Sequence, residues 1–297
     1  MPHRDGPRMN PRSTDVTVYG ETSLHVVTSA RPAADVGFGT VELAIGGPAA
    51  VVAAQLAALG NTPTLVSQVG VDPAGDFLRT ALETAGVDCR FVRSAGRTGR
   101  IVAGVADGQV ELAADSAADA LIGPENLPLP TTGLVYVTGF PALVPVIKEL
   151  SSNGHRMVVD VGYIPFLSQP DRLAAHITDI ADAVDTAVVS GASLSATVRE
   201  SIQELCLAEG ASTVLTTLAD HGVMVTTANG TEHLPAVPAD VVDPLCAGDA
   251  FVAGFMSRRA AGDDVISAAA YAQYVAAAKV QMFGSLPRLS DVEELRK

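Results

Sequence analysis

The sequence predicts an α/β fold in which helices cover both faces of a mostly parallel sheet. Two observations carry this prediction: short β-branched runs alternate with Ala- and Leu-rich stretches, and most of the runs are apolar throughout. With 297 residues, 48% of them hydrophobic, the chain is long enough to bury one large core without a disulfide or metal. We therefore expect a single domain at residues 15–297, after a loose polar tail at residues 1–14.

The elements of the first half follow from turn and cap signals. Asp72 and Pro73 supply a capping carboxylate and a first-turn proline for a helix that ends at Gly86, and Gly60 ends an Ala-rich helix before it. The strands expected here are 16–19, 43–45 and 64–69, and the earlier helix is 49–59.

The second half continues the alternation. Its expected strands are 134–138, 157–161, 186–190, 213–217 and 223–226. Its expected helices are 141–153, 171–183, 194–209, 247–260 and 264–283. Because only a short turn separates the last two strands, we expect them to form an antiparallel hairpin.

Two extended regions do not fit the parallel sheet. Residues 91–114 carry an Asp107-Gly108 turn between two alternating runs, which predicts a hairpin. Residues 26–44 show no helical pattern. We expect these two regions to pair as a small second sheet.

Composition excludes several classes of function. The 19 basic and 33 acidic residues give a net charge of −14, and only 4% of residues are aromatic, with no Trp. A nucleic-acid binder needs a basic face and stacking platforms, so we expect none. The isolated Cys89, Cys206 and Cys246 predict a reducing, cytoplasmic setting rather than a disulfide framework. No apolar stretch of about 18 residues occurs, so no membrane partner is expected.

The strongest chemical signal is the segment that runs from Asp243 to Asp249. A turn of small residues ends in an acid at the start of an Ala/Phe/Val helix. Backbone N–H groups in such a turn bind anions, and a carboxylate there can accept the proton of an attacking hydroxyl, as phosphoryl transfer requires. A plain helix cap by Asp249 explains the same residues equally well at this point.

The same segment, DPLCAGDAFVAGF, resembles the DTxGAGDAFxAGF signature of the PfkB (ribokinase-like) carbohydrate and nucleoside kinases. GGPAAVVAAQLAALG and VSQVGVDPAGDFLRTALETAGVD resemble the N-terminal signature region of that family, and TTLADHGVMV is similar to its TLGxxG strand pair. Thr98-Gly99 is similar to the start of its TG-opened hairpin. The resemblance covers residues 16–290, in order.

This resemblance implies a ribokinase-like three-layer α/β/α sandwich with a mostly parallel central sheet and a small β-lid. It implies ATP and Mg²⁺ as cofactors and a hydroxymethyl group of a sugar or nucleoside as acceptor. Asp249 would be the catalytic base. The anion hole would be the backbone of Cys246, Ala247 and Gly248. Asp243 would support the loop or the metal region.

The resemblance also implies binding positions and a partner. The implied acceptor-binding positions are His25, Gly46, Gly47 and Val51. The implied nucleotide-binding positions are Thr217, Ala219, Gly222 and Gln273. Lid strands in this family often pair between subunits, which implies a homodimer through the lid.

Several family positions are altered. His25 stands where the family has an Asp that binds acceptor hydroxyls, and Val51 stands where it has an Asn. The magnesium-organising NxxE motif is absent from residues 190–194, and residues 160–164 keep the Asp of DxNxR but lose its Asn and Arg. Cys246 replaces the anion-hole Gly, where a positive φ would cost about 1 kcal/mol.

These residues leave two function classes open. The first is an ATP-dependent kinase acting on a primary hydroxyl of a sugar, nucleoside or related molecule, with a degenerate acceptor site. The alternative is a catalytically impaired PfkB-fold protein that binds a nucleotide or metabolite. A third reading, a purely structural or interaction protein, is disfavoured because the acid at the helix start occurs together with its small-residue turn. The minor reading of Cys246 as a nucleophile is disfavoured as well, since no adjacent base is visible. P-loop, GxSxG and HExxH motifs are absent.

Overall fold

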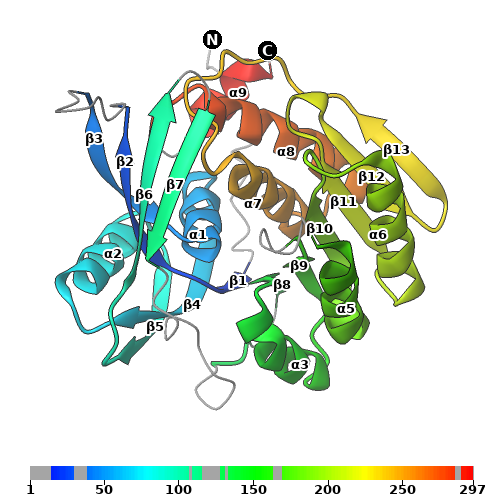
Figure 1. Cartoon of the computed structure of the whole chain (residues 1–297), viewed down its shortest axis with the longest axis horizontal. Coiled ribbons are helices and arrows are strands. Elements are labelled where there is room, and N and C mark those ends of the chain that lie inside the picture. The colour runs from blue at the N-terminus through cyan, green and yellow to red at the C-terminus, as the bar shows by residue number, and fades with distance from the viewer. Residues whose placement is uncertain are drawn as a thin grey trace, which may run out of the picture.

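A nine-stranded sheet forms the centre of the computed structural model, which describes residues 15–29, 39–106, 109–115, 128–130, 133–162, 169–284 and 289–296 (Figure 1). The order is β13-β12-β11-β10-β9-β8-β1-β4-β5, and all neighbours pair in parallel except β11–β12 and β12–β13. The strands are β1 Asp15–Tyr19, β4 Thr62–Gly70, β5 Asp88–Ser94, β8 Leu134–Thr138, β9 Met157–Asp160, β10 Val184–Ser190, β11 Thr213–Thr217, β12 Val223–Thr227 and β13 Gly230–Leu234.

The sequence pattern places most of this sheet correctly. Strands β8 and β11 have the predicted bounds, and the antiparallel β11–β12 hairpin is confirmed. Two strands are missing from the prediction. The β13 strand is short, polar and exposed, so its sequence shows no apolar run. The β5 strand was assigned in part to the second sheet, but residues 91–94 pair with β4 in the main sheet.

Helices cover both faces of the sheet (Figure 1). One core joins α1 Pro48–Ala58, α7 Ala247–Ala260 and α8 Val265–Val280 to the strands, and the other joins α3 Val144–Ser152, α5 Pro170–Ile180 and α6 Ala196–Ala208. Close contact of α7 with α8 depends on Gly254, where a Cβ atom would meet Ala272 and Val275 within about 3 Å. The remaining long helices are α2 Pro73–Thr84 and α9 Leu289–Leu295. None of the helices in the described ranges is long and apolar enough to cross a membrane.

A second, four-stranded sheet has the order β3-β2-β6-β7. Its strands are β2 Ser23–Thr28, β3 Val41–Gly46, β6 Gly99–Ala106 and β7 Gln109–Asp115. The β2 and β6 strands pair in parallel, and the two outer pairs are antiparallel. The Asp107-Gly108 turn predicted between β6 and β7 lies outside the described residues.

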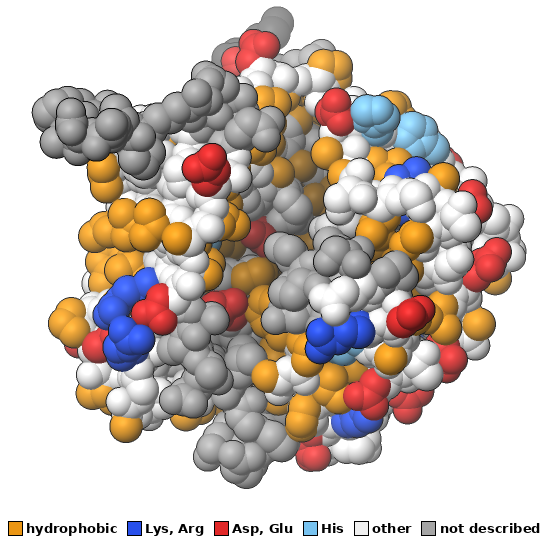
Figure 2. All heavy atoms as spheres, viewed as in Figure 1, with side chains coloured by type: hydrophobic (Ala, Val, Ile, Leu, Met, Phe, Trp, Pro, Cys, Tyr) orange, Lys and Arg blue, Asp and Glu red, His pale blue; other side chains and the backbone are white. Residues whose placement is uncertain are grey.

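The second sheet has an inner and an outer face, set by the alternation of its side chains. On the inner face, Val27, Ala103 and Val105 are buried and pack against Leu245 and Phe283, from the segments before α7 and after α8. The inner face therefore lies over the turn that leads into α7. Figure 2 shows the surface hollowed between this sheet and the helical body, with acidic side chains inside the hollow.

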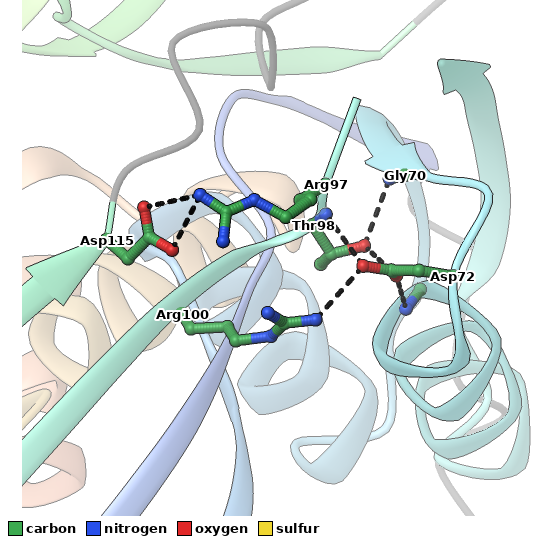
Figure 3. A network of polar contacts seen from close by, with 7 residues as sticks. Gly70, Asp72, Arg97, Thr98, Arg100 and Asp115 are labelled. Carbon is green, nitrogen blue, oxygen red and sulfur yellow. Dashed lines mark hydrogen bonds and ion pairs between the residues drawn. The ribbon is translucent and has the colours of Figure 1, made fainter. Parts of the chain in front are cut away.

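A polar network fixes the point where the chain passes from β5 into β6 (Figure 3). Asp72 caps α2 by accepting from Gly75 N at 2.9 Å, and the same carboxylate accepts from the Thr98 hydroxyl at 2.6 Å and the Arg100 guanidinium at 3.2 Å. Thr98 Oγ1 in turn accepts from Gly70 N at 3.0 Å. Burial alone would raise the pKa of Asp72, but the hydrogen bonds from Thr98 and Gly75 hold it below its usual range. The network thus anchors the second sheet to the loop between β4 and α2.

Strand order also places the ligand-binding crevice. From β1 the sheet grows through β4 and β5 on one side and through β8 and β9 on the other. In open α/β sheets, ligands bind at the carboxyl ends of strands where the order reverses in this way. In this chain that position lies between Gly20, after β1, and Thr138, at the end of β8.

The anchor generates a stability prediction. Asp72→Ala should lower the free energy of unfolding by about 1–2 kcal/mol, because it removes the α2 cap and leaves Thr98 N–H and Gly75 N–H without an acceptor. Denaturant unfolding measures the change. Asp88→Ala is the matched control. Asp88 forms an exposed ion pair with Arg90 of the same strand, β5, so its removal should change the free energy of unfolding little. Equal effects of the two substitutions would contradict the role of Asp72.

Candidate active site

A buried ion pair holds the turn before α7. Asp243 has no exposed surface, and Lys279 of α8 is 2% exposed. Lys279 Nζ lies 3.4 Å from Asp243 Oδ2 and donates to the carbonyl oxygens of Asp243 and Met282. The Asp243 carboxylate also accepts from Leu245 N and Gly284 N, both at 2.9 Å. Both Asp243 oxygens thus have partners inside the protein, as the predicted loop-supporting role requires, and the metal role of Asp243 stays a prediction.

Cys246 occupies a left-handed backbone conformation at the N-cap of α7, with φ 61° and ψ 17°. This is the positive φ that a family Gly would adopt without strain. The conformation turns the chain so that α7 begins directly after it. Ala247 N donates to Pro244 O at 3.3 Å, whereas Gly248 is exposed and its N–H has no backbone partner among the described residues. Gly248 N–H, at a helix N-terminus, is therefore one donor of the predicted anion hole that has no partner among the described residues.

Asp249 lies in the first turn of α7, half-buried beside a second carboxyl group. Burial raises the pKa of Asp249 to about 7, and the negative charge of Asp160 adds to the rise. A hydrogen bond with the Cys246 thiol and the charge of Lys279 act in the opposite direction. Burial likewise raises the pKa of Asp160, at the end of β9, to about 6. A carboxyl group poised near neutral pH suits proton transfer.

The Cys246 thiol stays protonated. Burial and the neighbouring Asp249 charge raise its pKa well above the usual value. The structure therefore argues against the minor reading of Cys246 as a nucleophile, since the thiolate is the reactive form. Cys89, Cys206 and Cys246 are all free, in agreement with the predicted absence of disulfides among them.

The implied acceptor positions cluster where the two sheets meet. His25, on β2, is buried, and its imidazole occupies the space that a Cβ atom on Gly46 would need. Gly47 has φ 84°, and a Cβ atom there would contact the backbone of Glu21. Val51 is buried one turn into α1. Burial lowers the pKa of His25 to about 4, so the ring is neutral.

The implied nucleotide positions lie around the turn between β11 and β12. Ala219 and Gly222 have φ values of 53° and 93°, and Gly222 packs closely against the backbone of residues 234–236. Gln273 of α8 donates to the carbonyls of Leu234 and Pro235 at 3.1 and 3.2 Å. Thr217 ends β11. Gly222 and Gln273 thus contact the same segment, residues 234–236 at the end of β13, which joins the turn between β11 and β12 to α8.

The region of the lost NxxE motif is held by an arginine. Arg199 of α6 donates to the carbonyls of Gly191 and Leu194 at 3.3 and 2.6 Å. No cluster of three or more metal-ligating side chains occurs among the described residues. Mg²⁺ in kinases is held by one or two carboxylates together with substrate phosphates. Asp160 fits this requirement, because among the described residues its carboxylate accepts only from Gly162 N, at 3.0 Å, which leaves oxygen lone pairs for an ion.

Sequence reasoning missed three residues beside this site. Ser23, Tyr136 and Thr138 are buried, and their hydroxyl oxygens have no hydrogen-bond partner among the described residues. No motif contains them. The only sequence signal is a polar residue at the carboxyl end of an apolar strand, which Thr138 provides. Burial raises the pKa of Tyr136 well above its usual value, and the negative charges of Asp160 and Asp249 add to the rise. The Tyr136 hydroxyl therefore lies near both carboxyl groups.

The fold and this site together define an α/β kinase-like enzyme with a lid sheet over the carboxyl ends of parallel strands. The chain belongs to the pfkB family of carbohydrate kinases, whose profile matches residues 13–290. It is 30% identical over 233 residues to the aminoimidazole riboside kinase of Salmonella typhimurium, covering 71% of this chain and 72% of that protein. It is 24% identical over 269 residues to the ribokinase of Staphylococcus aureus, covering 84% and 87%.

Solved structures agree on the fold. The fructokinase of Xylella fastidiosa with bound ATP matches with a TM-score of 0.79 at 22% identity, over 96% of this chain and 98% of that one. These findings confirm the predicted ribokinase-like fold and, at the level of the family, a PfkB-type sugar or nucleoside kinase that uses ATP and Mg²⁺.

The left-handed Cys246 gives a prediction about strain. Cys246→Gly should be about 1 kcal/mol more stable than Cys246→Ala, because glycine adopts φ 61° freely and alanine keeps the Cβ atom that conflicts with it. Denaturant unfolding of the two variants compares them directly. An alanine variant as stable as the glycine variant would show that the backbone here is unstrained.

Proposed function

We propose that the chain transfers the γ-phosphoryl group of ATP to a hydroxymethyl group of a nucleoside-like acceptor, with Asp249 as the base. The observation that carries the proposal is the position of Asp249. It lies in the first turn of a helix that starts with the exposed Gly248, whose N–H has no partner among the described residues, near the reversal of strand order. A base and an anion site thus lie within one turn of helix.

These residues have two chemical roles in the proposed reaction: they hold the transferred phosphoryl group and accept the proton of the acceptor hydroxyl. Asp249, when ionised, accepts the proton of the acceptor hydroxyl as that oxygen attacks the γ-phosphorus. Gly248 N–H and the positive end of α7 stabilise the charge on the transferred phosphoryl group. Mg²⁺ with ATP neutralises phosphate charge, and Asp160 is the residue that would hold it.

The acceptor class follows from the groups that face it. On the inner face of the second sheet, Val27, Ala44, Ile101 and Ala103 form an apolar surface around the neutral His25. Val51 offers no hydrogen bond. This surface suits the flat heteroaromatic part of a nucleoside, which a free sugar lacks. The relation to aminoimidazole riboside kinase agrees with this choice.

We further propose that the outer face of the second sheet joins two copies of the chain. Val41 and Leu43 on β3 and Val102 on β6 are exposed there, on the two strands that flank β2. Figure 2 shows a hydrophobic patch at the left of the view, over this sheet. A self-complementary apolar patch is typical of an interface between identical subunits.

A second candidate function has its own support. The strained Cys246 and the loss of the NxxE motif favour a protein of the same fold that binds a nucleotide or metabolite with little turnover. ADP release from ATP and Mg²⁺, measured across a panel of sugars and nucleosides, distinguishes the two. The kinase proposal requires acceptor-dependent ADP release.

The role of Asp249 is tested by Asp249→Asn. This variant keeps the size of the side chain and removes the base, so we expect the turnover rate to fall at least roughly a hundredfold with the Kd for ATP little changed. Thermal unfolding verifies that the variant is folded. Turnover close to that of the wild type in a folded variant would remove Asp249 from the mechanism.

Acceptor choice is tested by comparing kcat/KM on ribose, fructose and a set of nucleosides. We expect the nucleosides to be the better substrates, since the apolar inner face rewards a heteroaromatic group. The double variant His25→Asp/Val51→Asn restores the family residues and should shift the preference toward free sugars. A wild-type enzyme that uses ribose or fructose as well as any nucleoside would contradict the proposal.

A further inference from the structure

Among the described residues, the buried side chains with polar atoms that have no hydrogen-bond partner are Thr22, Ser23, His25, Gln55, Tyr136 and Thr138. Four of these six lie on strands β2 and β8, on either side of Gly20. They are Ser23 and Tyr136, each with 0% exposure, Thr138 with 2% and His25 with 6%. Buried polar atoms in folded proteins are hydrogen-bonded in the great majority of cases, because an unpaired one destabilises the fold. A group of such atoms at one place in a protein therefore points to a ligand that completes them.

The four residues come from two strands that flank the same point. Gly20 lies beside Thr138, and a Cβ atom on Gly20 would overlap the Thr138 hydroxyl and lie 2.9 Å from Ala49 Cβ, at the start of α1. On the other side of α1's first turn, a Cβ atom on Gly47 would lie 3.0 Å from Ser23 N. A continuous line of contacts therefore runs from β8 to β2 past the start of α1.

The register of the strands gives each side chain its direction. Tyr136 and Thr138 are two residues apart on β8 and share one face, and Asp160 on β9 pairs with Thr138 on that face. Tyr136 packs in the core that includes α7, so this is the face that carries Asp249. Ser23 and His25 are likewise two apart on β2, on the inner face with Val27. One pair thus lies on the face of the main sheet that carries Asp249, and the other lies on the inner face of the second sheet.

We infer that Ser23, His25, Tyr136 and Thr138 form a neutral hydrogen-bonding subsite for the hydroxyl groups of the acceptor, an inference that rests on the proposed function. The subsite takes over the hydroxyl pairing that Asp and Asn perform at positions 25 and 51 in the family. Its groups are uncharged, and Asp160 and Asp249 beside it repel anions. The acceptor part that it binds is an uncharged, hydroxyl-bearing ring such as the ribose of a nucleoside.

A binding role and a structural role for Tyr136 and Thr138 predict opposite changes in stability. Removing a buried hydroxyl that has a partner destabilises the ligand-free protein, whereas removing one that has none leaves stability equal or higher. The substitutions Tyr136→Phe and Thr138→Val each delete one such oxygen with little change of shape. Thr186→Val is the matched control. Thr186 is buried near the amino end of β10, whereas Thr138 lies at the carboxyl end of β8.

The experiment measures acceptor affinity by calorimetry with inosine and cytidine, in the presence of a non-hydrolysable ATP analogue. We expect Tyr136→Phe and Thr138→Val to weaken nucleoside binding roughly tenfold or more, with unchanged affinity for the analogue and no loss of stability without ligand. Thr186→Val should bind as the wild type does. The wild type should bind a 2′-deoxynucleoside more weakly than the corresponding nucleoside. This difference in affinity should be smaller in the variant that lacks the hydroxyl oxygen paired with the 2′-hydroxyl.

Two results overturn the subsite. One is nucleoside affinity within about twofold of the wild type in both variants, and the other is a wild type that binds neither nucleoside. The outcome for catalysis is separate. If the wild type binds inosine in the expected manner and releases no ADP with ATP and Mg²⁺, the kinase proposal fails and the subsite stands.

Discussion

The buried pair of Lys279 and Asp243 sets the geometry on which the site depends. It ties the end of α8 to the turn before α7, and through Leu245 N and Gly284 N it fixes the backbone on both sides. Removing either charge would leave the other one buried and unpaired, which costs several kcal/mol, about 3–5 in typical proteins. Lys279 reaches Asp249 electrostatically as well and opposes the rise in its pKa.

Around this fixed turn, the crevice combines parts of very different origin. The proposed base and anion site come from one helix start, the floor from two neighbouring parallel strands and the lid from a sheet assembled from distant segments. What these parts share is their place at the reversal of strand order, between β1 and β8. In the proposed function, a substrate there would contact β2, β8 and α7 at once. Its recognition would then depend on the packing of the second sheet over Leu245 as much as on any single side chain.

The fold and the Asp249 turn were accessible from sequence because both leave local signals. Apolar runs between helices define the parallel strands, and the small-residue turn with its following helix defines the anion site. The β13 strand was missed because its side chains are polar and exposed, so its sequence shows no alternation of apolar and polar residues. Tyr136 was missed for a different reason. It looks like any core aromatic in a strand, and only the three-dimensional structure shows that its hydroxyl is unpaired and near two carboxylates.

The parallel pairing of β2 with β6 has a consequence for the order in which the molecule assembles. Between these strands the chain runs through β3, α1, β4, α2 and β5, so their ladder closes a long loop and gains no stability until that loop is ordered. The Asp72–Thr98 anchor can form only once β4, α2 and β5 are in place. The second sheet is therefore complete only when the whole segment from β3 to β5 is ordered, so the lid over the α7 turn and the β4–α2 part of the main sheet are coupled in stability.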